Sequence, residues 1–181
     1  MEREQYDLMF AQEERHWWYV GMRRISSALL ERFPPQVADQ AARPLDVLDA
    51  GCGSGGMTRY LQRFGRVTGI DLSTDALRLA RKRELPRLAR ASIGALPFLD
   101  NSFDVVTSFD VLYHLNVEND GAALADIHRV LRPGGSLHVV DVRGDALSRL
   151  FEDAGFDCAV VGSGHIRLAG RLTYLRATRP A

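Results

Sequence analysis

The stretch VLDAGCGSGG, at residues 47–56, decides the fold of this 181-residue chain. It begins within the apolar run LDVLDA (45–50), which is typical of a strand buried on both faces of a parallel sheet. The glycines that follow predict a tight turn into a helix, where the backbone of the loop can approach a ligand closely. Their spacing fits both GxGxxG and GxGxG, and such loops are typical of nucleotide-binding α/β proteins.

Strand and helix patterns continue to alternate after this loop, which predicts an α/β, doubly wound, Rossmann-like core over residues 45–181. Before the core, residues 1–44 are predicted to be helical up to residue 33 and then to form a polar connector. The last two expected strands flank a glycine-containing reversal and predict an antiparallel hairpin at the sheet edge. After the first strand, the expected helices lie at 57–64, 73–83, 120–131 and 145–154, and the expected strands at 67–70, 103–109, 136–142, 157–162 and 172–179, with a short strand at the start of the loop 92–98.

The bulk composition argues against several classes of protein. Basic and acidic residues balance at 23 each, so no global field attracts nucleic acid or an anionic membrane. No window approaches the roughly 18 consecutive apolar residues of a membrane span, and the charged N-terminus has no signal-peptide core. Cys52 and Cys158 give neither a disulfide framework nor a metal motif. A cytoplasmic location, with no membrane partner, is therefore expected.

Two acidic residues decide between ligand classes. Asp71 ends the second expected strand, where an adenosine-bearing ligand needs an acceptor for its ribose hydroxyls. Asp49 would repel the pyrophosphate of NAD but attract the ammonium and sulfonium groups of S-adenosyl-L-methionine (SAM). The single lysine, Lys82, lies on a helix away from the expected site, so it cannot serve as the catalytic lysine that many hydride-transfer enzymes need. The residues favour SAM over a nicotinamide dinucleotide.

Four segments, in order between residues 45 and 142, resemble the successive motifs of class I SAM-dependent methyltransferases: VLDAGCGSGG, VTGIDLS, ALPFLDNSFDVVTSFDVLYHL and ALADIHRVLRPGGSLHVVD. The resemblance implies a seven-stranded sheet with an antiparallel last strand. It also implies SAM as cofactor and S-adenosyl-L-homocysteine as product. The segment EERHWWYVGMRR (13–24) resembles a segment that precedes the core in a bacterial small-molecule branch of this family.

The resemblance also implies roles for individual residues. Asp71 would bind the ribose, and Leu72 would lie against the adenine. Ser92 stands where relatives often have an aspartate, which weakens the side-chain contact to the adenine amino group. The other implied cofactor-binding residues are Asp49, Gly51, Cys52, Gly53 and Gly55 for the methionyl part, Ile93 for the adenine, and Phe109, with the neighbouring Asp110, for the sulfonium and the acceptor.

The chemistry that the resemblance implies places few demands on the protein. Methyl transfer from SAM is an in-line displacement that releases a neutral thioether, so it needs neither an acid nor a metal, only alignment. An oxygen acceptor would also need a base, and His114 is the candidate, with a scaffold role as the alternative. Tyr113 stands where metal-binding relatives have a second acid, so no metal is expected.

The aromatic N-terminal segment is expected to cover the cofactor. Residues 6–24 are predicted to form a helical lid, with Tyr6 and Trp18 touching the ligand. Adjacent tryptophans on a helix point in different directions, so one can pack in the core while the other faces a cleft. The alternative is that these aromatic residues only staple the N-terminal helices to the sheet.

The acceptor is the least determined part of the function. The leading hypothesis is methyl transfer to the oxygen or nitrogen of a small molecule. Relatives with the HWW segment commonly carry an insertion after the fifth strand, whereas VVDV (139–142) here runs almost directly into the next helix. The pocket would then be open, or completed by the lid or by a second copy in a homodimer. Two alternatives stay open: a SAM-binding module that serves a partner without its own turnover, and an RNA methyltransferase, which the zero net charge disfavours.

Overall fold

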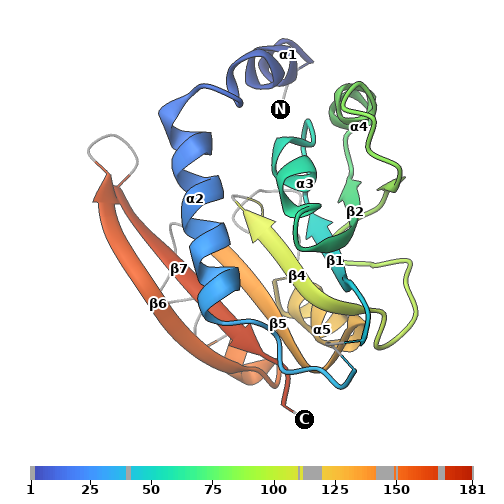
Figure 1. The fold of residues 1–181 in the computed structure, drawn as a ribbon, viewed down its shortest axis with the longest axis vertical. Coiled ribbons are helices and arrows are strands. Elements are labelled where there is room, and N and C mark those ends of the chain that lie inside the picture. The colour runs from blue at the N-terminus through green and yellow to red at the C-terminus, as the bar shows by residue number, and fades with distance from the viewer. Residues whose placement is uncertain are drawn as a thin grey trace.

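A seven-stranded sheet forms the centre of the computed structural model, which describes residues 3–39, 42–109, 111, 120–141, 149, 151–166 and 170–180 (Figure 1). The strand order is β3-β2-β1-β4-β5-β7-β6. The strands are β1 (Leu45–Ala50), β2 (Gly65–Asp71), β3 (Leu88–Arg90), β4 (Phe103–Phe109), β5 (Leu131–Asp141), β6 (Asp157–Ile166) and β7 (Gly170–Thr178).

The pairing of the strands confirms the predicted doubly wound sheet with an antiparallel last strand. The pairs β1–β2, β2–β3, β1–β4 and β4–β5 are parallel, whereas β7 runs antiparallel to both β5 and β6. The chain moves outward from β1 to β3 and then returns to β4 on the other side of β1. The neighbouring carboxyl ends of β1 and β4 are therefore the topological switch point, where ligands bind in open α/β sheets.

Helices cover both faces of the sheet, as the continuous apolar strands predict. On one face, Leu30 of α2 packs against Val47, Val105 and Leu61 of α3; on the other, Leu48 belongs to the larger core cluster that includes α5. Figure 1 shows α2 in front of the sheet and α5 behind it. The helices are α1 (Arg3–Gln12), α2 (Trp17–Arg32), α3 (Gly56–Leu61), α4 (Thr74–Arg81) and α5 (Asp120–Val130).

The N-terminal helical region differs from the prediction of uninterrupted helix up to residue 33. It divides into α1 and α2 at residues 13–16, where His16 is extended (φ −66°, ψ 129°). Arg23 of α2 donates hydrogen bonds to the backbone carbonyls of Glu13 (2.7 Å) and Glu14 (3.2 Å). These bonds satisfy carbonyls that the end of a helix leaves without partners, and thus stabilise the break.

The segment RPGG (132–135) also differs from its prediction, because it does not separate a helix from a later strand. β5 begins at Leu131 and runs through it, with a register irregularity opposite Phe103–Val105. Gly134 donates to the carbonyl of Arg179 (2.9 Å), whose own N–H donates to Gly135 (3.0 Å). These main-chain bonds keep the glycines in the sheet.

Smaller differences concern element boundaries. β3 lies before the loop 92–98, in which only an isolated bridge joins Ser92 to Ala95. Most of the predicted helix 145–154 lies outside the described residues, although 151–153 are helical and Gly155 has the predicted left-handed conformation (φ 88°). Ser73 caps α4 as predicted, since its side chain accepts a hydrogen bond from the N–H of Ala76 (3.2 Å).

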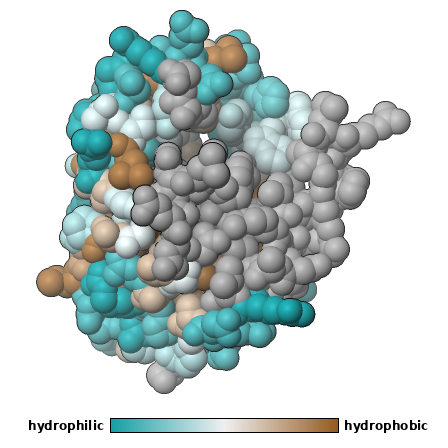
Figure 2. Space-filling view, turned by 180° about the vertical axis from the view of Figure 1, so that it is seen from behind, coloured by the Kyte–Doolittle hydropathy of each residue, from teal (hydrophilic) through white to brown (hydrophobic). Residues whose placement is uncertain are grey.

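The described part of the chain exposes few large apolar side chains. Figure 2 shows hydrophilic residues along much of the described surface, with small and separate hydrophobic patches. None of the described helices has the length and apolar character needed to cross a bilayer. The exposed large hydrophobic residues are Leu8, Trp17, Ile25, Leu72 and Leu99.

Candidate functional site

The glycine loop occupies the carboxyl end of β1, at the switch point of the sheet. Gly51, Gly53 and Gly55 all have left-handed backbone conformations, with φ of 87°, 54° and 84°. The N–H groups of Gly51 and Cys52 donate to the carbonyl of Ile70 at 2.9 and 2.8 Å, which ties the loop to β2. Residues with a Cβ rarely adopt these conformations, so the sequence of the loop fixes its path.

The three glycines face different surroundings. A Cβ at Gly51 would overlap the side chain of Val111, and one at Gly55 would lie 2.7 Å from Leu85 Cδ1. At Gly53 the nearest atom to an added Cβ would be the methyl group of Met9, at 3.1 Å. Gly51 and Gly55 are therefore needed for packing within the core, whereas Gly53 faces α1.

Asp71 joins the glycine loop to the start of α4. Its carboxylate accepts hydrogen bonds from the N–H of Gly53 (2.9 Å) and the N–H of Ser73 (2.8 Å). Each carboxylate oxygen has a second lone pair, so the group can still accept bonds from ligand hydroxyls. The next residue, Leu72, is 41% exposed and offers an apolar surface beside this carboxylate.

Tyr6 of α1 reaches the same acid from the other side. Its side chain is half-buried, near Ser73 and the carboxylates of Asp71 and Asp75. Burial is the main cause that raises the pKa of the Tyr6 hydroxyl, and the carboxylates of Asp71 and Asp75 raise it further. The structure thus brings Tyr6, Gly53 and Asp71, three of the residues predicted to bind the cofactor, close together.

Asp49 lies below the loop and is only 2% exposed. Its carboxylate accepts hydrogen bonds from the hydroxyls of Thr58 (2.6 Å) and Thr107 (3.0 Å). Burial raises its pKa to about 6, although these two hydrogen bonds act in the opposite direction. The described partners of this carboxylate are two neutral hydroxyls, so a cationic ligand above the loop would stabilise the ionised form.

The thiol of Cys52 lines the underside of the loop. It is buried, and burial is the main cause that raises its pKa far above the ordinary value, with the carboxylates of Asp49 and Asp71 adding to the effect. The thiol is therefore protonated at neutral pH. Because a nucleophilic cysteine must be a thiolate, the Cys52 thiol is unsuited to nucleophilic catalysis.

The two residues predicted to contact adenine lie in the loop after β3. Ile93 is 6% exposed, and its side chain packs into the main core cluster. Only its backbone is available to a ligand. Ser92 is half-buried, and its side chain accepts a hydrogen bond from the N–H of Gly94 (3.2 Å).

Trp18 and Phe109 meet in a different place. Both pack against the cluster of Met22 and Val140, on the α2 side of the sheet. Trp17 instead is 59% exposed, and its ring lies nearly perpendicular to that of Trp18 (89°). The structure therefore places Trp18 and Phe109 against the same cluster, on the α2 side of the sheet.

The predicted catalytic residues Asp110 and His114 lie outside the described residues. Within the described ranges, no group of three or more His, Cys, Asp or Glu residues could hold a metal ion. Sequence reasoning missed Met9, Thr58 and Thr107. A buried carboxylate needs hydrogen-bond donors, so the threonines in the first turn of α3 and in the apolar β4 run were the available signal.

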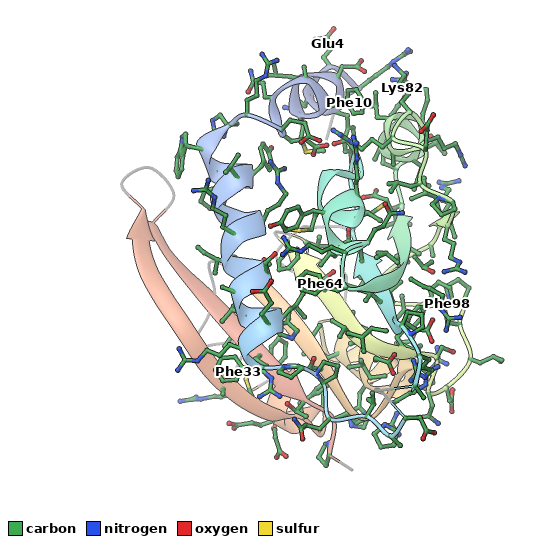
Figure 3. The ribbon with its side chains drawn as sticks, viewed as in Figure 1. Glu4, Phe10, Phe33, Phe64, Lys82 and Phe98 are labelled. Carbon is green, nitrogen blue, oxygen red and sulfur yellow. The ribbon has the colours of Figure 1, made fainter. Side chains whose placement is uncertain are left out.

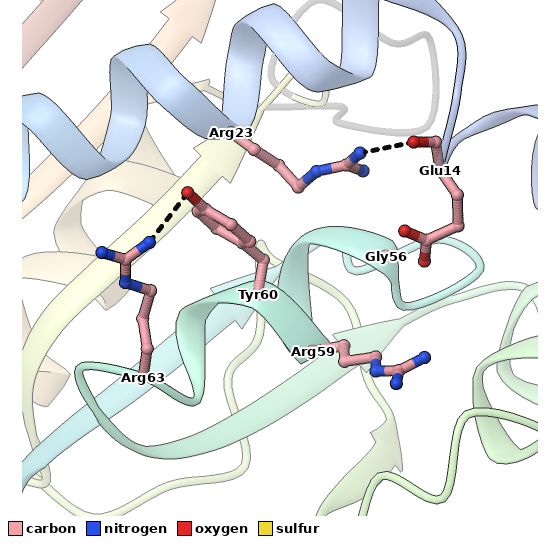
Figure 4. Close-up of a pocket in the computed structure, with 6 residues that line it drawn as sticks. All are labelled: Glu14, Arg23, Gly56, Arg59, Tyr60 and Arg63. Atoms are coloured by element: carbon pink, nitrogen blue, oxygen red, sulfur yellow. Dashed lines mark hydrogen bonds between the residues drawn. The ribbon is translucent and has the colours of Figure 1, made fainter.

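A pocket of about 390 Å³ opens between α2 and α3 (Figure 4). Arg63 donates a hydrogen bond to the Tyr60 hydroxyl (2.9 Å), and Arg23 bonds the Glu14 carbonyl. None of the predicted cofactor-binding residues lines this pocket, although Gly56 directly follows the glycine loop. Its lining residues are Glu14, Arg23, Gly56, Arg59, Tyr60 and Arg63.

Comparisons with known proteins agree on a family. A sequence profile described as "Methyltransferase domain" matches residues 48–139. A malonyl-[acyl-carrier protein] O-methyltransferase of Pseudescherichia vulneris is 41% identical over 115 residues, which cover 61% of this chain and 44% of that protein. A demethylmenaquinone methyltransferase of Tropheryma whipplei is 44% identical over 100 residues, covering 53% of this chain and 41% of the relative. The chain thus spans less than half the length of these two relatives.

Solved structures share the fold. A 1,6-didemethyltoxoflavin-N1-methyltransferase of Burkholderia thailandensis, with bound S-adenosylhomocysteine, has a TM-score of 0.68 at 24% identity. That match covers 99% of this chain and 87% of the other. A magnesium protoporphyrin IX methyltransferase of Synechocystis PCC 6803, with bound SAM, has a TM-score of 0.68 at 22% identity, covering 89% of this chain and 81% of the other.

Proposed function

The chain belongs to the class I SAM-dependent methyltransferase family, and we propose that it transfers a methyl group from SAM to an oxygen or nitrogen of a small-molecule acceptor. The observation that carries the proposal is the convergence of two carboxylates, Asp49 and Asp71, on one loop of left-handed glycines. Carboxylates at these places suit a cationic, adenosine-bearing ligand and oppose a pyrophosphate.

The residues present fit this cofactor. Asp71 would hold the ribose, with Leu72 against the adenine, and its bond to the Gly53 N–H fixes its orientation. Asp49 would attract the ammonium group of the cofactor from beneath the loop. Tyr6 would cover the ligand from the α1 side. Gly51, Cys52, Gly53 and Gly55 would form the floor of the methionyl pocket, while Ser92 and Ile93 would edge the adenine.

The bound cofactor would supply an electrophilic methyl group on a cationic sulfur. The chain's own part would then be to align the acceptor with that methyl group and to exclude water, which is a large part of catalysis for such a displacement. Phe109 ends β4 on the side where the acceptor would enter. Asp110 would orient the acceptor, and His114 would take its proton when the acceptor atom is oxygen.

The acceptor could also be linked to a carrier protein. The observation that favours this second candidate is the 41% identity to an enzyme named for malonyl-[acyl-carrier protein]. An acceptor of this kind would suit the short connection after β5, because an open pocket admits a tethered group. We expect the reaction to take place in the cytoplasm, where the buried Cys52 thiol stays reduced.

An acceptor panel tests the proposed activity. The purified protein would be incubated with SAM and a set of amines, phenols, carboxylates, an acyl-carrier thioester and RNA, and release of S-adenosylhomocysteine would be measured. We expect release with at least one small-molecule or carrier-bound acceptor, and none from an Asp71→Asn variant. Asp75→Asn is the matched control, because this neighbouring acid of α4 makes only exposed ion pairs at 3.7 and 3.9 Å.

The same panel separates the alternatives. If the protein binds SAM but no acceptor yields product, the chain is a SAM-binding module that serves a partner. If RNA alone supports turnover, the small-molecule assignment is wrong. A dimer in sedimentation experiments whose dissociation abolishes turnover would support a pocket completed by a second copy.

A further inference from the structure

We propose that Arg83 is a positioning residue that holds α1 closed over the cofactor loop and so sets how fast the cofactor leaves. This inference rests on the cofactor site proposed above. Arg83 lies just past the end of α4, and its side chain is only 5% exposed. A buried guanidinium requires several acceptors, which here come from two different parts of the chain.

The contacts of Arg83 join α1, the glycine loop and α4. Its guanidinium forms an ion pair with the buried carboxylate of Glu13 and another with Glu14 at 2.7 Å. Its Nε donates to the backbone carbonyl of Ser54, in the glycine loop, at 2.9 Å. One side chain therefore connects the end of the N-terminal helix to the loop that would bind the cofactor.

Phe10 completes the contact from the α1 side. The Arg83 guanidinium lies 4.4 Å from the centre of the Phe10 ring, and the Lys82 ammonium lies 5.8 Å from it. Figure 3 shows Phe10 and Lys82 close together between α1 and α4. The attraction between the Arg83 cation and the face of the Phe10 ring adds to the ion pair, and it is stronger where water is excluded.

The described side chains of α1 are exposed or half-buried. Over its full length, Arg3–Gln12, α1 has no buried side chain, so apolar burial contributes little to its docking. The other ion pairs of the described part of α1, Arg78–Asp7 at 3.2 Å and Arg3–Asp75 at 3.9 Å, have side chains that are at least 38% exposed. Exposed pairs stabilise weakly, so the buried pair of Arg83 with Glu13, just past the end of α1, should be the strongest of the ion pairs described for this region.

The position of α1 matters because of what it carries. Met9 lies over Gly53, and Tyr6 reaches Ser73 and Asp71. The Glu13 carboxylate fills the space beside Gly56, where a Cβ would overlap it. A ligand on the loop would therefore lie beneath α1, and its exit would require α1 to move.

Removal of Arg83 should release this helix. Without the guanidinium, the Glu13 carboxylate would be left buried without its cation, which is strongly unfavourable. Undocking of α1 returns that carboxylate to water and breaks no apolar core. The Arg83→Gln variant should therefore open at α1 while the sheet stays folded.

Two measurements on the full chain test this prediction. In cofactor-free protein, hydrogen exchange of the amides of residues 5–13 should be about tenfold faster or more in Arg83→Gln, with exchange in β1 and β4 unchanged. Stopped-flow dissociation of S-adenosylhomocysteine should also be faster by about tenfold or more. Arg78→Gln is the matched control, since it removes an exposed tie between the same helices, and it should change both rates by less than about twofold.

Glu13→Gln provides a second variant that keeps Arg83 and the shape of the pair. It should accelerate both rates, and the double variant should not add the two single effects, because both act on one contact. Unchanged exchange at residues 5–13 in both variants would overturn the proposal. If the wild-type chain fails to bind S-adenosylhomocysteine, the proposed function is wrong. The exchange measurement still tests whether Arg83 holds α1 in place.

Discussion

Asp49 shows how a single buried acid can link ligand charge to pH. Its pKa in the folded protein is raised to about 6 by burial, from an ordinary value of 3.8. A raised carboxyl pKa contributes stability that is complete below the ordinary value and is lost as pH rises through about 6. At neutral pH the ionised group therefore destabilises the cofactor-free protein by about 3 kcal/mol.

Asp49→Asn should remove this pH dependence. We expect the variant to be at least as stable as wild type at pH 7, because the amide needs no ionisation, and to lose the decline in stability between pH 5 and pH 7. Urea unfolding at the two pH values measures this. In wild type, SAM should bind more tightly as pH rises through about 6, since a cation favours the carboxylate. Equal affinity at pH 5 and pH 7 would contradict the assignment.

Gly53 and Gly55 should respond differently to alanine. At Gly53 an added Cβ meets only the flexible end of Met9, so Gly53→Ala should cost about 1 kcal/mol of stability through its left-handed φ. The variant should mainly weaken SAM binding, by about tenfold or more, because the added alanine methyl group occupies the face of the loop below α1.

Gly55→Ala instead would meet the side chains of Leu85 and Ala80 and should lower stability by several kcal/mol, on the order of an overpacked core. Thermal unfolding and calorimetric titration with SAM separate the two variants. An affinity loss confined to Gly55→Ala would show that Gly53 does not face the ligand.

The residues that sequence reasoning found and missed differ in a physical way. Asp49 and Asp71 lie at the carboxyl ends of β1 and β2, and the glycines are the residue type that a left-handed turn requires, so local pattern was enough. Thr107 and Glu13 act only through contacts with residues distant in the sequence, 58 and 70 positions away. No local spacing predicts such contacts.

At the scale of elements, a buried acid fixes the ends of β1 and β4 that lie opposite the glycine loop. Asp104 is fully buried and accepts bonds from Arg43 (2.6 and 2.7 Å), Arg132 (2.8 Å) and the N–H of Asp46 (2.8 Å). Burial raises the pKa of its carboxyl, but these bonds together lower it by more. The network aligns the two strands whose other ends carry the site.

Asp104→Asn should therefore destabilise the protein by about 3 kcal/mol or more, since the two arginines lose their buried anion. In wild type, the lowered pKa contributes stability that is present above the ordinary value and is lost as pH falls through the folded value. Urea unfolding from pH 6 down to pH 3 should show this loss in wild type and a smaller loss in the variant. A variant as stable as wild type at pH 6 would contradict the role of the network.

The tryptophans of α2 allow a matched pair of variants. Trp18 packs against Met22 and Val140, whereas Trp17 is 59% exposed. Trp18→Ala should lower stability by about 2 kcal/mol and weaken SAM binding, if α2 helps to cover the ligand as the sequence predicts. Trp17→Ala should do neither. An unchanged dissociation constant for SAM in a folded Trp18→Ala variant would mean that Trp18 only anchors α2 to the sheet.

Element boundaries were predicted well where burial dictates them. The bounds predicted for β1 and β4 agree with the structure, because both strands are continuous apolar runs buried on both faces. The break between α1 and α2 was missed because Arg23 stabilises it from outside the break. Likewise, β5 extends through Gly134 because Arg179 pairs with it across the sheet.

For the whole molecule, strand order is what assembles the site. The position of β1 between β2 and β4 places the glycine loop beside Asp71 on one side and Phe109 on the other. Alternating patterns predicted the strands and the closing hairpin. The position of β7 between β5 and β6 was not predicted, because the hydrophobic period carries no information on which strands are neighbours.

Isothermal calorimetry of the wild-type chain with SAM, S-adenosylhomocysteine and NAD tests the central claim most directly. We expect saturable heat with both SAM and S-adenosylhomocysteine, at one site per chain. NAD should give none, because two carboxylates face the loop. If the well-folded protein bound NAD but neither SAM nor S-adenosylhomocysteine, the assignment of a SAM site would be contradicted.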